Sequence, residues 1–218
     1  ALEDDEVLSM LDAVSKGTGL TPHERVYWEK TKKRDKTILI LFLTYGLRLS
    51  ELQQLNISSF NFTREEFKIY RKRGKESTMP LNNSVTKVII DYINNERRTD
   101  DVLEPSHKDA LFLSLQGKRM TQRQIRDLVK KYTSIALKTS RSAGYSPHKL
   151  RATAATSLIG RGNSIYDVAA LLDHEQVTTT QLYAKHRANV KRNLVSGMEW
   201  EEERLDVNSK EAQKESED

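Results

Sequence analysis

The sequence contains no cysteine, which excludes disulfide bonds and zinc sites built from thiolates. It also lacks a long apolar run: the most apolar segment, residues 38–43, is far shorter than the roughly 18 residues of a membrane-spanning helix. The first residues are acidic, whereas a secretory signal starts with basic residues followed by an apolar segment. These absences favour a globular protein of a reducing compartment.

Basic charge is concentrated in the body of the chain. Residues 201–218 hold eight acidic and three basic residues, so they carry −5 of the formal net charge of +5, and residues 1–200 carry +10. A basic body suits a polyanionic partner, because bound nucleic acid releases counterions from its phosphates. A soluble basic surface explains the same charge, so charge alone leaves both interpretations open. Residues 201–218 have too few apolar residues to fold alone, and we expect a flexible acidic tail there.

Hydrophobic spacing predicts a mainly α-helical protein with one small antiparallel β-sheet, an α+β fold in a single domain over residues 1–200. Helices are predicted at residues 3–16, 34–45, 50–55, 83–97, 121–139, 148–160, 164–172 and 178–194. A further helical segment starts after Thr21, a candidate N-cap, with Pro22 at its first position. Short strands are predicted at residues 57–62, 66–70 and 76–80.

His148 and Arg151 lie one turn apart at the start of a predicted helix. Ser146 can cap this helix, and Pro147 lies in its first turn, where no N–H is missed. The N-terminus of a helix carries partial positive charge, which suits a phosphate. Both residues could also be ordinary surface residues. We favour a function, because small residues on both sides of Arg151 pack closely and indicate a partly buried charge.

Arg48 follows a predicted buried helix and a glycine, Gly46, and stands between two leucines that anchor the backbone. A guanidinium group can bind two phosphate oxygens at once, and Glu51, one turn further on, can brace it. An ordinary ion pair at the end of a helix is an equally good interpretation of these residues.

Lys72 lies in a turn between two predicted strands. A lysine on such a hairpin could protonate a leaving oxygen, or it could be one cation of a solvated basic turn. For its neighbours Arg71, Arg73 and Lys75 we favour the second interpretation, with contacts to a DNA backbone and no chemical role.

His174 is predicted in a tight connection between two helices. Tyr183 follows in the first turns of the second helix, for which Thr178 and Gln181 have the spacing of a capping box. A tyrosine beside a leucine is usually a core residue, and we assign the other seven tyrosines to the core.

Taken in order and spacing, these motifs resemble the tyrosine recombinase family, which includes phage integrases and Xer-like proteins, from about residue 2 to residue 190. The resemblance implies the catalytic-domain fold of that family. It also implies roles: Tyr183 as nucleophile, Arg48 and Arg151 as phosphate clamp, Lys72 as general acid, His148 and His174 in proton transfer and hydrogen bonding, Glu51 in support, and Lys149 in DNA contact. Two positions depart from the family pattern: Asp173, where glycine often stands, and Ala152, where histidine is common.

The resemblance further implies the reaction: cleavage and rejoining of DNA through a 3′-phosphotyrosyl link, with a 5′-hydroxyl released and no metal, ATP or other cofactor. It implies double-stranded DNA with recombination sites as the partner, a homo-oligomer, a tetramer on DNA, and a cytoplasmic protein of bacterial or phage origin. We expect the family's N-terminal core-binding domain to be absent from this chain. A type IB topoisomerase and a non-catalytic DNA-binding protein are the alternatives.

The segment after Tyr183 has an apolar stripe, with Val190, Leu194 and Met198 spaced four residues apart. An exposed stripe of this kind is unfavourable in a monomer. We expect residues 188–200 either to pack on a second subunit or to fold back on their own domain.

Overall fold

The computed structural model of the protein describes residues 1–172 and 181–200, and for residues 181–187 it describes the backbone alone. The helices are α1 (Asp4–Lys16), α2 (Pro22–Tyr45), α3 (Leu49–Gln53), α4 (Asn83–Asn95), α5 (Gln122–Leu137), α6 (Pro147–Gly160), α7 (Ile165–Leu172) and α8 (Gln181–Ser196). The strands are β1 (Phe60–Asn61), β2 (Glu66–Arg71) and β3 (Lys75–Pro80), and short 3-10 turns connect several elements. The predicted fold class is therefore confirmed.

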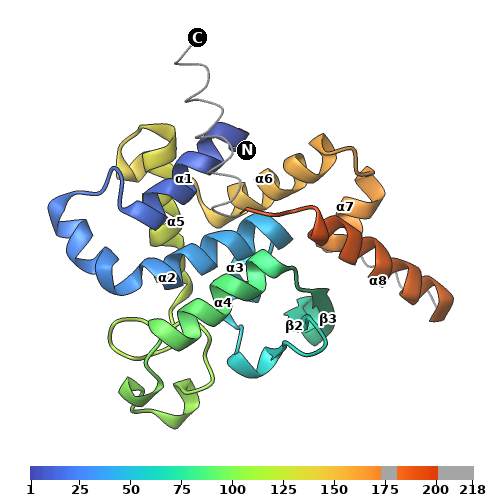
Figure 1. The fold of residues 1–218 in the computed structure, drawn as a ribbon, viewed down its shortest axis with the longest axis horizontal. Helices are drawn as coiled ribbons and strands as arrows, with labels where there is room; N and C mark the ends of the chain where they lie inside the picture. Colours follow the sequence, from blue (N-terminus) through green and yellow to red (C-terminus); the bar gives the residue numbers. More distant parts are fainter. Residues whose placement is uncertain (173–180, 201–218) are drawn as a thin grey trace.

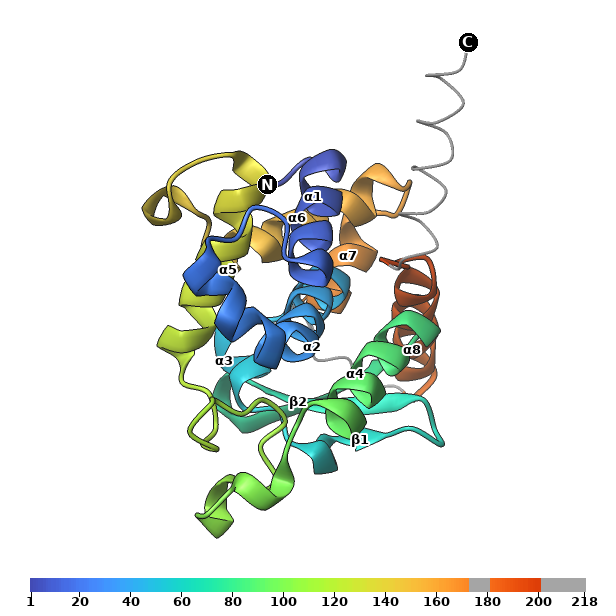
Figure 2. The same cartoon turned by 60° about the vertical axis from the view of Figure 1, so that its left-hand side comes forward.

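Helix α2 runs through the middle of the molecule and contacts α1, α4 and α6 (Figures 1 and 2). Its second half, residues 37–45, is buried at every position, as expected for a helix that is apolar all round. No helix of the described residues is long and apolar enough to cross a membrane.

The prediction of a separate helix at residues 34–45 is wrong, because α2 is continuous from Pro22. The predicted start is right: the Thr21 side chain accepts the N–H of Glu24. The carboxylate of Glu96, from the end of α4, accepts the backbone N–H groups of Lys33 and Arg34, each at 2.8 Å. A side chain distant in the sequence thus contacts α2 at the point where the second helix was expected to begin.

The sheet is antiparallel in the order β1-β2-β3. Strand β2 buries every second residue, Phe67, Ile69 and Arg71, and Phe67 packs edge-on against the ring of Tyr45 at the end of α2. The predicted strand at residues 57–62 is mostly wrong, because residues 57–59 form a 3-10 turn and the strand is limited to β1.

The end of α8 folds back on its own domain, which was one of the two expected arrangements. Leu194, Val195 and Met198 are buried, and the side-chain amide of Asn82 donates to the carbonyl oxygens of Val195 (2.9 Å) and Met198 (3.1 Å). Arg161, the C-cap residue of α6, adds a hydrogen bond of 2.7 Å to the carbonyl oxygen of Gly197. The apolar stripe is therefore a part of the core of this chain.

Candidate active site

The turn between α2 and α3 carries the first candidate arginine. Gly46 follows α2 with a φ of 60°, and a Cβ atom at this position would lie 2.0 Å from Cδ2 of Leu172. The close approach of α7 therefore requires glycine here. Arg48, half-buried, is the N-cap residue of α3, and its backbone N–H donates to Oε1 of Glu51 at 2.8 Å. Glu51 thus fixes the backbone from which Arg48 projects.

The second candidate arginine reaches the same turn from α6. Nη1 of Arg151 donates to the carbonyl oxygen of Gly46 at 2.6 Å, a contact between residues 105 apart in the sequence. His148 lies one turn earlier on α6 and is exposed. Ser146 is the N-cap residue of α6, but its predicted capping bond is wrong, because its side chain makes none. The fold therefore brings together the two arginines predicted to hold phosphate.

Lys72 lies in the tight turn between β2 and β3, as predicted, and its side chain is exposed. Arg73 and Gly74 have φ angles of 63° and 69°, the left-handed conformations that reverse the chain in so short a connection. The side chains of Arg73 and Lys75 are exposed as well. On α6, Lys149 is exposed with its Nζ 5.8 Å from the ring centre of Tyr145. Contacts of these cations with DNA stay predictions.

Arg71 differs from the hypothesis that grouped it with the exposed cations of the hairpin, because it is only 7% exposed. Its Nε lies 3.5 Å from Oε2 of Glu51, and its Nη2 donates to the carbonyl oxygen of Leu171 at 2.8 Å. The hypothesis of a solvated side chain is therefore wrong for Arg71, and its contact with the DNA backbone stays a prediction. The cause is the two-residue period of β2, which turns Arg71 inward with Phe67 and Ile69.

His174 and the side chain of Tyr183 lie outside the described residues, as do Asp173 and the predicted cap at Thr178. The backbone of Tyr183 is in the first turn of α8, as expected from the sequence. Of the six candidate catalytic residues, the structure therefore describes the side chains of four: Arg48, Lys72, His148 and Arg151.

The buried tyrosines are unsuited to act as nucleophiles. Burial raises the pKa of Tyr92 to about 12 and raises the pKa of Tyr45 well above its ordinary value. The Tyr45 hydroxyl also donates to a backbone carbonyl at the end of β3, at 2.5 Å. The core assignment is wrong for Tyr27, Tyr70 and Tyr166, which are 47%, 51% and 87% exposed on the outer faces of α2, β2 and α7.

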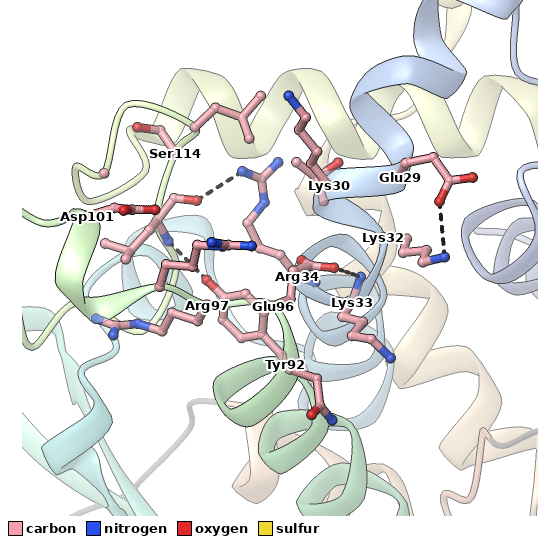
Figure 3. Close-up of a pocket in the computed structure, with 16 residues that line it drawn as sticks. Glu29, Lys30, Lys32, Lys33, Arg34, Tyr92, Glu96, Arg97, Asp101 and Ser114 are labelled. Atoms are coloured by element: carbon pink, nitrogen blue, oxygen red, sulfur yellow. Dashed lines mark hydrogen bonds and ion pairs between the residues drawn. The ribbon is translucent and has the colours of Figure 1, made fainter.

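A pocket of about 630 Å³ lies between α2, α4 and the segment 97–117 (Figure 3). Two of its arginines join segments of the backbone: Nη1 of Arg34 donates to the carbonyl oxygen of Leu113 at 3.0 Å, and Nη2 of Arg97 donates to that of Ala110 at 2.6 Å. None of the four candidate catalytic residues whose side chains the structure describes lines this pocket. We therefore interpret it as a part of the scaffold and not as the reaction site.

Comparison with known proteins gives the family. The model of the phage integrase family matches residues 1–189. Tyrosine recombinase XerD of Staphylococcus epidermidis is 30% identical over 184 residues, which are 84% of this chain and 56% of the relative. Tyrosine recombinase XerC of Caldanaerobacter subterraneus subsp. tengcongensis is 39% identical over 153 residues, which are 70% of this chain and 41% of the relative. The chain belongs to the phage integrase family of tyrosine recombinases, and it spans about half the length of the curated relatives it matches.

Solved structures agree on the fold. The crystal structure of XerA recombinase aligns with a TM-score of 0.61 at 21% identity, over 85% of this chain and 65% of that chain. The lambda integrase catalytic core aligns with a TM-score of 0.53 at 13% identity, over 83% of this chain and 94% of that chain. At such identities the likeness shows the fold alone, which is that of tyrosine recombinase catalytic cores.

Proposed function

We propose that this chain is the catalytic domain of a site-specific recombinase that cleaves and rejoins DNA through a 3′-phosphotyrosyl intermediate. The observation that carries the proposal is the hydrogen bond of 2.6 Å from Arg151 to the carbonyl oxygen of Gly46. It brings a second guanidinium group to the turn that bears Arg48. Two such groups suit the non-bridging oxygens of a single phosphodiester, since each can donate two parallel hydrogen bonds.

In the proposed reaction the phenolic oxygen of Tyr183 attacks the phosphorus, and the bond between the phosphorus and the 5′ oxygen breaks. Lys72 donates a proton to that leaving oxygen, while His148 and His174 take up and hold the phenol proton. Arg48 and Arg151 offset the charge that develops on the phosphorane oxygens. The 5′-hydroxyl of a partner strand then reverses the step, so the energy of the ester bond is conserved and no ATP is consumed.

The proposed substrate is double-stranded DNA with recombination sites, bound by a tetramer of the whole protein. The charge of +10 on residues 1–200 supports an electrostatic contribution to DNA binding. Two solved relatives also support it: XerH was crystallised bound to a palindromic difH substrate, and lambda integrase as a dimer bound to a core site. We propose that Arg73, Lys75 and Lys149 contact the DNA backbone, since all three are exposed around the arginine turn and the hairpin.

A covalent-trapping experiment tests the function. Nicked duplexes with a randomised central segment lose a short strand on cleavage, so the adduct cannot be reversed. We expect wild-type protein to form an adduct that survives denaturation, and Tyr183→Phe to form none while its DNA affinity and melting temperature stay unchanged. Tyr166→Phe is the matched control, because Tyr166 is 87% exposed and loses the same hydroxyl.

Two results would contradict the proposal: no adduct from wild-type protein with any duplex, or a normal adduct from Tyr183→Phe. The duplexes that the wild-type protein cleaves then serve as substrates to decide between a recombinase and a topoisomerase. Holliday junctions from paired sites identify a recombinase, whereas relaxation of a supercoiled plasmid without strand exchange identifies a topoisomerase.

A further inference from the structure

Arg71 is a buried cation at the base of an otherwise exposed basic turn. It is the last residue of β2 and comes directly before Lys72. Its backbone closes the hairpin, since Arg71 pairs with Lys75 in the β2–β3 ladder. Arg71 is 7% exposed, whereas residues 72–76 are all exposed. The position of Lys72 therefore depends on how the side chain of Arg71 is held.

The guanidinium group of Arg71 joins its own hairpin to two other segments of the candidate site, α3 and the end of α7. Its Nε lies 3.5 Å from Oε2 of Glu51, and both side chains are almost fully buried, at 4% and 2% exposure. The other carboxylate oxygen of Glu51 accepts the backbone N–H of Arg48 at 2.8 Å. Through Glu51, the base of the Lys72 hairpin is thus connected to the turn of the first candidate arginine.

The second connection is to the end of α7. Nη2 of Arg71 donates to the carbonyl oxygen of Leu171 at 2.8 Å, a contact across 100 residues of sequence. Leu172 is the last residue of α7, and its side chain packs close to Gly46. His174 follows two residues later in the sequence. Arg71 therefore fixes the point from which the chain continues towards His174.

This geometry requires arginine. The planar fork of a guanidinium group acts in two directions at once: here Nη2 donates to a backbone carbonyl while Nε pairs with a carboxylate, whereas an ammonium group is a single point. A buried ion pair is weak evidence for stability, because apolar residues of similar volume often replace it without loss. The location of this pair, between the Arg48 turn, the Lys72 hairpin and the end of α7, indicates a role in placing those segments.

We propose that Arg71 is a positioning residue for the cleavage step, which holds the Lys72 hairpin, the Arg48 turn and the end of α7 in one arrangement. The proposal rests on the proposed function, because it presupposes that Lys72 protonates the leaving 5′ oxygen. Arg71 acts through its neighbours and does not touch the DNA.

The test compares Arg71→Lys with wild type in single-turnover cleavage of duplexes that wild-type protein cleaves. Each duplex is made with an ordinary phosphodiester and with a 5′-bridging phosphorothiolate, whose sulfur leaves without protonation. We expect Arg71→Lys to cleave ordinary DNA about tenfold to a hundredfold more slowly, as displaced catalytic groups do. We expect a smaller defect on the phosphorothiolate, and unchanged DNA affinity. Arg64→Lys, the same change at an exposed position in the turn between β1 and β2, should leave every quantity unchanged.

Several results would overturn the role of Arg71. Normal cleavage by Arg71→Lys does so. Equal defects on both substrates indicate a general structural role, and a parallel loss of DNA affinity indicates a phosphate contact. Absence of adducts from wild-type protein would instead contradict the proposed function itself, so the two failures are distinguishable.

A double variant covers the case that Arg71→Lys does not fold. Arg71→Met with Glu51→Gln removes both buried charges and keeps an oxygen that can accept the N–H of Arg48. If Arg71 has the proposed positioning role, the double variant folds and cleaves both substrates more slowly than wild type. The ratio of its rate to the wild-type rate should be higher on the phosphorothiolate than on ordinary DNA. A folded double variant with a normal rate on ordinary DNA overturns the proposal, and so does failure of both variants to fold.

Discussion

The candidate site has two parts that the structure holds in different ways. The arginine part consists of Arg48, Glu51, Arg71 and Arg151, which are buried or half-buried. The side chains of Glu51, Arg71 and Arg151 are bonded to backbone groups of Arg48, Leu171 and Gly46. The proton part consists of Lys72 and His148, which are exposed in the hairpin turn and the first turn of α6.

The difference follows from the tasks proposed for the two parts. Groups that stabilise a developing charge are effective when they are fixed beforehand in a site of low dielectric constant. Groups that transfer a proton need to come within hydrogen-bond reach when the substrate is bound. We therefore expect changes at Arg48 and Arg151 to slow every cleavage reaction alike, and changes in the proton part to slow those in which the leaving group needs a proton. A change at Arg71, which also holds the Lys72 hairpin, should combine both effects.

Lys72→Ala should give the largest effect among the side chains of these two parts. We expect cleavage of ordinary DNA to fall by about 10²–10⁴-fold, the usual contribution of a general acid, and cleavage of the phosphorothiolate to be largely restored. The melting temperature should hardly change, because the side chain is exposed. Arg64→Ala, in the exposed turn between β1 and β2, is the control. Equal defects on both substrates would mean that Lys72 only contacts phosphate, and the comparison of the two parts would fail.

Arg151→Lys tests the arginine part. Lysine lacks the fork that bonds the Gly46 carbonyl and also reaches a phosphate, so we expect cleavage to fall by about 10²–10³-fold. In contrast to Lys72→Ala, the defect should be the same on ordinary and phosphorothiolate DNA. Arg161→Lys is the matched control, because Arg161 also donates to a backbone carbonyl but lies at the far end of α6. Rescue of Arg151→Lys by the phosphorothiolate would assign Arg151 to proton transfer.

Local sequence patterns predicted where the functional side chains of both parts lie, but not the contacts that hold the arginine part. The turn of Lys72, the helix start at Pro147 and the glycine before Arg48 are properties of a few neighbouring residues, and the structure has them where the sequence indicated. The two-residue period of β2 could also have shown that Arg71 faces inward with Phe67 and Ile69.

The partners of the arginine part could not be found in this way. The contacts of Arg151 with Gly46 and of Arg71 with Leu171 join residues 105 and 100 apart, and no local pattern encodes such a pairing. The same holds for Glu96, whose carboxylate accepts N–H groups of α2 from 62 and 63 residues away. The sequence shows which side chains can bind phosphate or transfer a proton, whereas the backbone groups that hold these side chains depend on the whole fold.

Asn82→Asp tests whether α8, the helix that bears Tyr183, is as firmly fixed to the domain as the arginine part, because Asn82 holds the end of α8. Aspartate keeps the oxygen that caps α4 but places a carboxylate against two carbonyl oxygens. We expect a loss of about 2 kcal/mol and a melting temperature lower by about 4–8 °C. Asn193→Asp, the same change at an exposed position of α8, should shift it little. An unchanged melting temperature of Asn82→Asp would show that the end of α8 is not fixed to this domain in solution.

Glu24→Gln should have the smallest effect, and it supplies a reference for both parts because it lies in neither. Glu24 accepts two hydrogen bonds from Arg141, at 2.9 and 3.1 Å, and these lower its pKa from 4.5 to about 2. A carboxylate with a lowered pKa stabilises the folded protein above its unfolded pKa, and this stabilisation is lost as the pH falls from about 4.5 towards 2. Glutamine keeps an oxygen for the capping bond to the N–H of Thr21 but carries no charge.

Glu24→Gln should therefore be less stable than wild type by about 1 kcal/mol at pH 7, the upper range for a partly exposed ion pair. The difference between the two free energies of unfolding, measured with urea at a series of pH values, should shrink as the pH falls below about 4.5. A difference independent of pH would mean that the Arg141 contact does not set the pKa of Glu24. The cleavage rate at pH 7 should equal that of wild type, since a small loss of stability far from the Gly46 turn leaves the folded population nearly complete. A slower reaction would mean that cleavage follows overall stability, and the contrast between the arginine part and the proton part would then have to be measured again at matched stability.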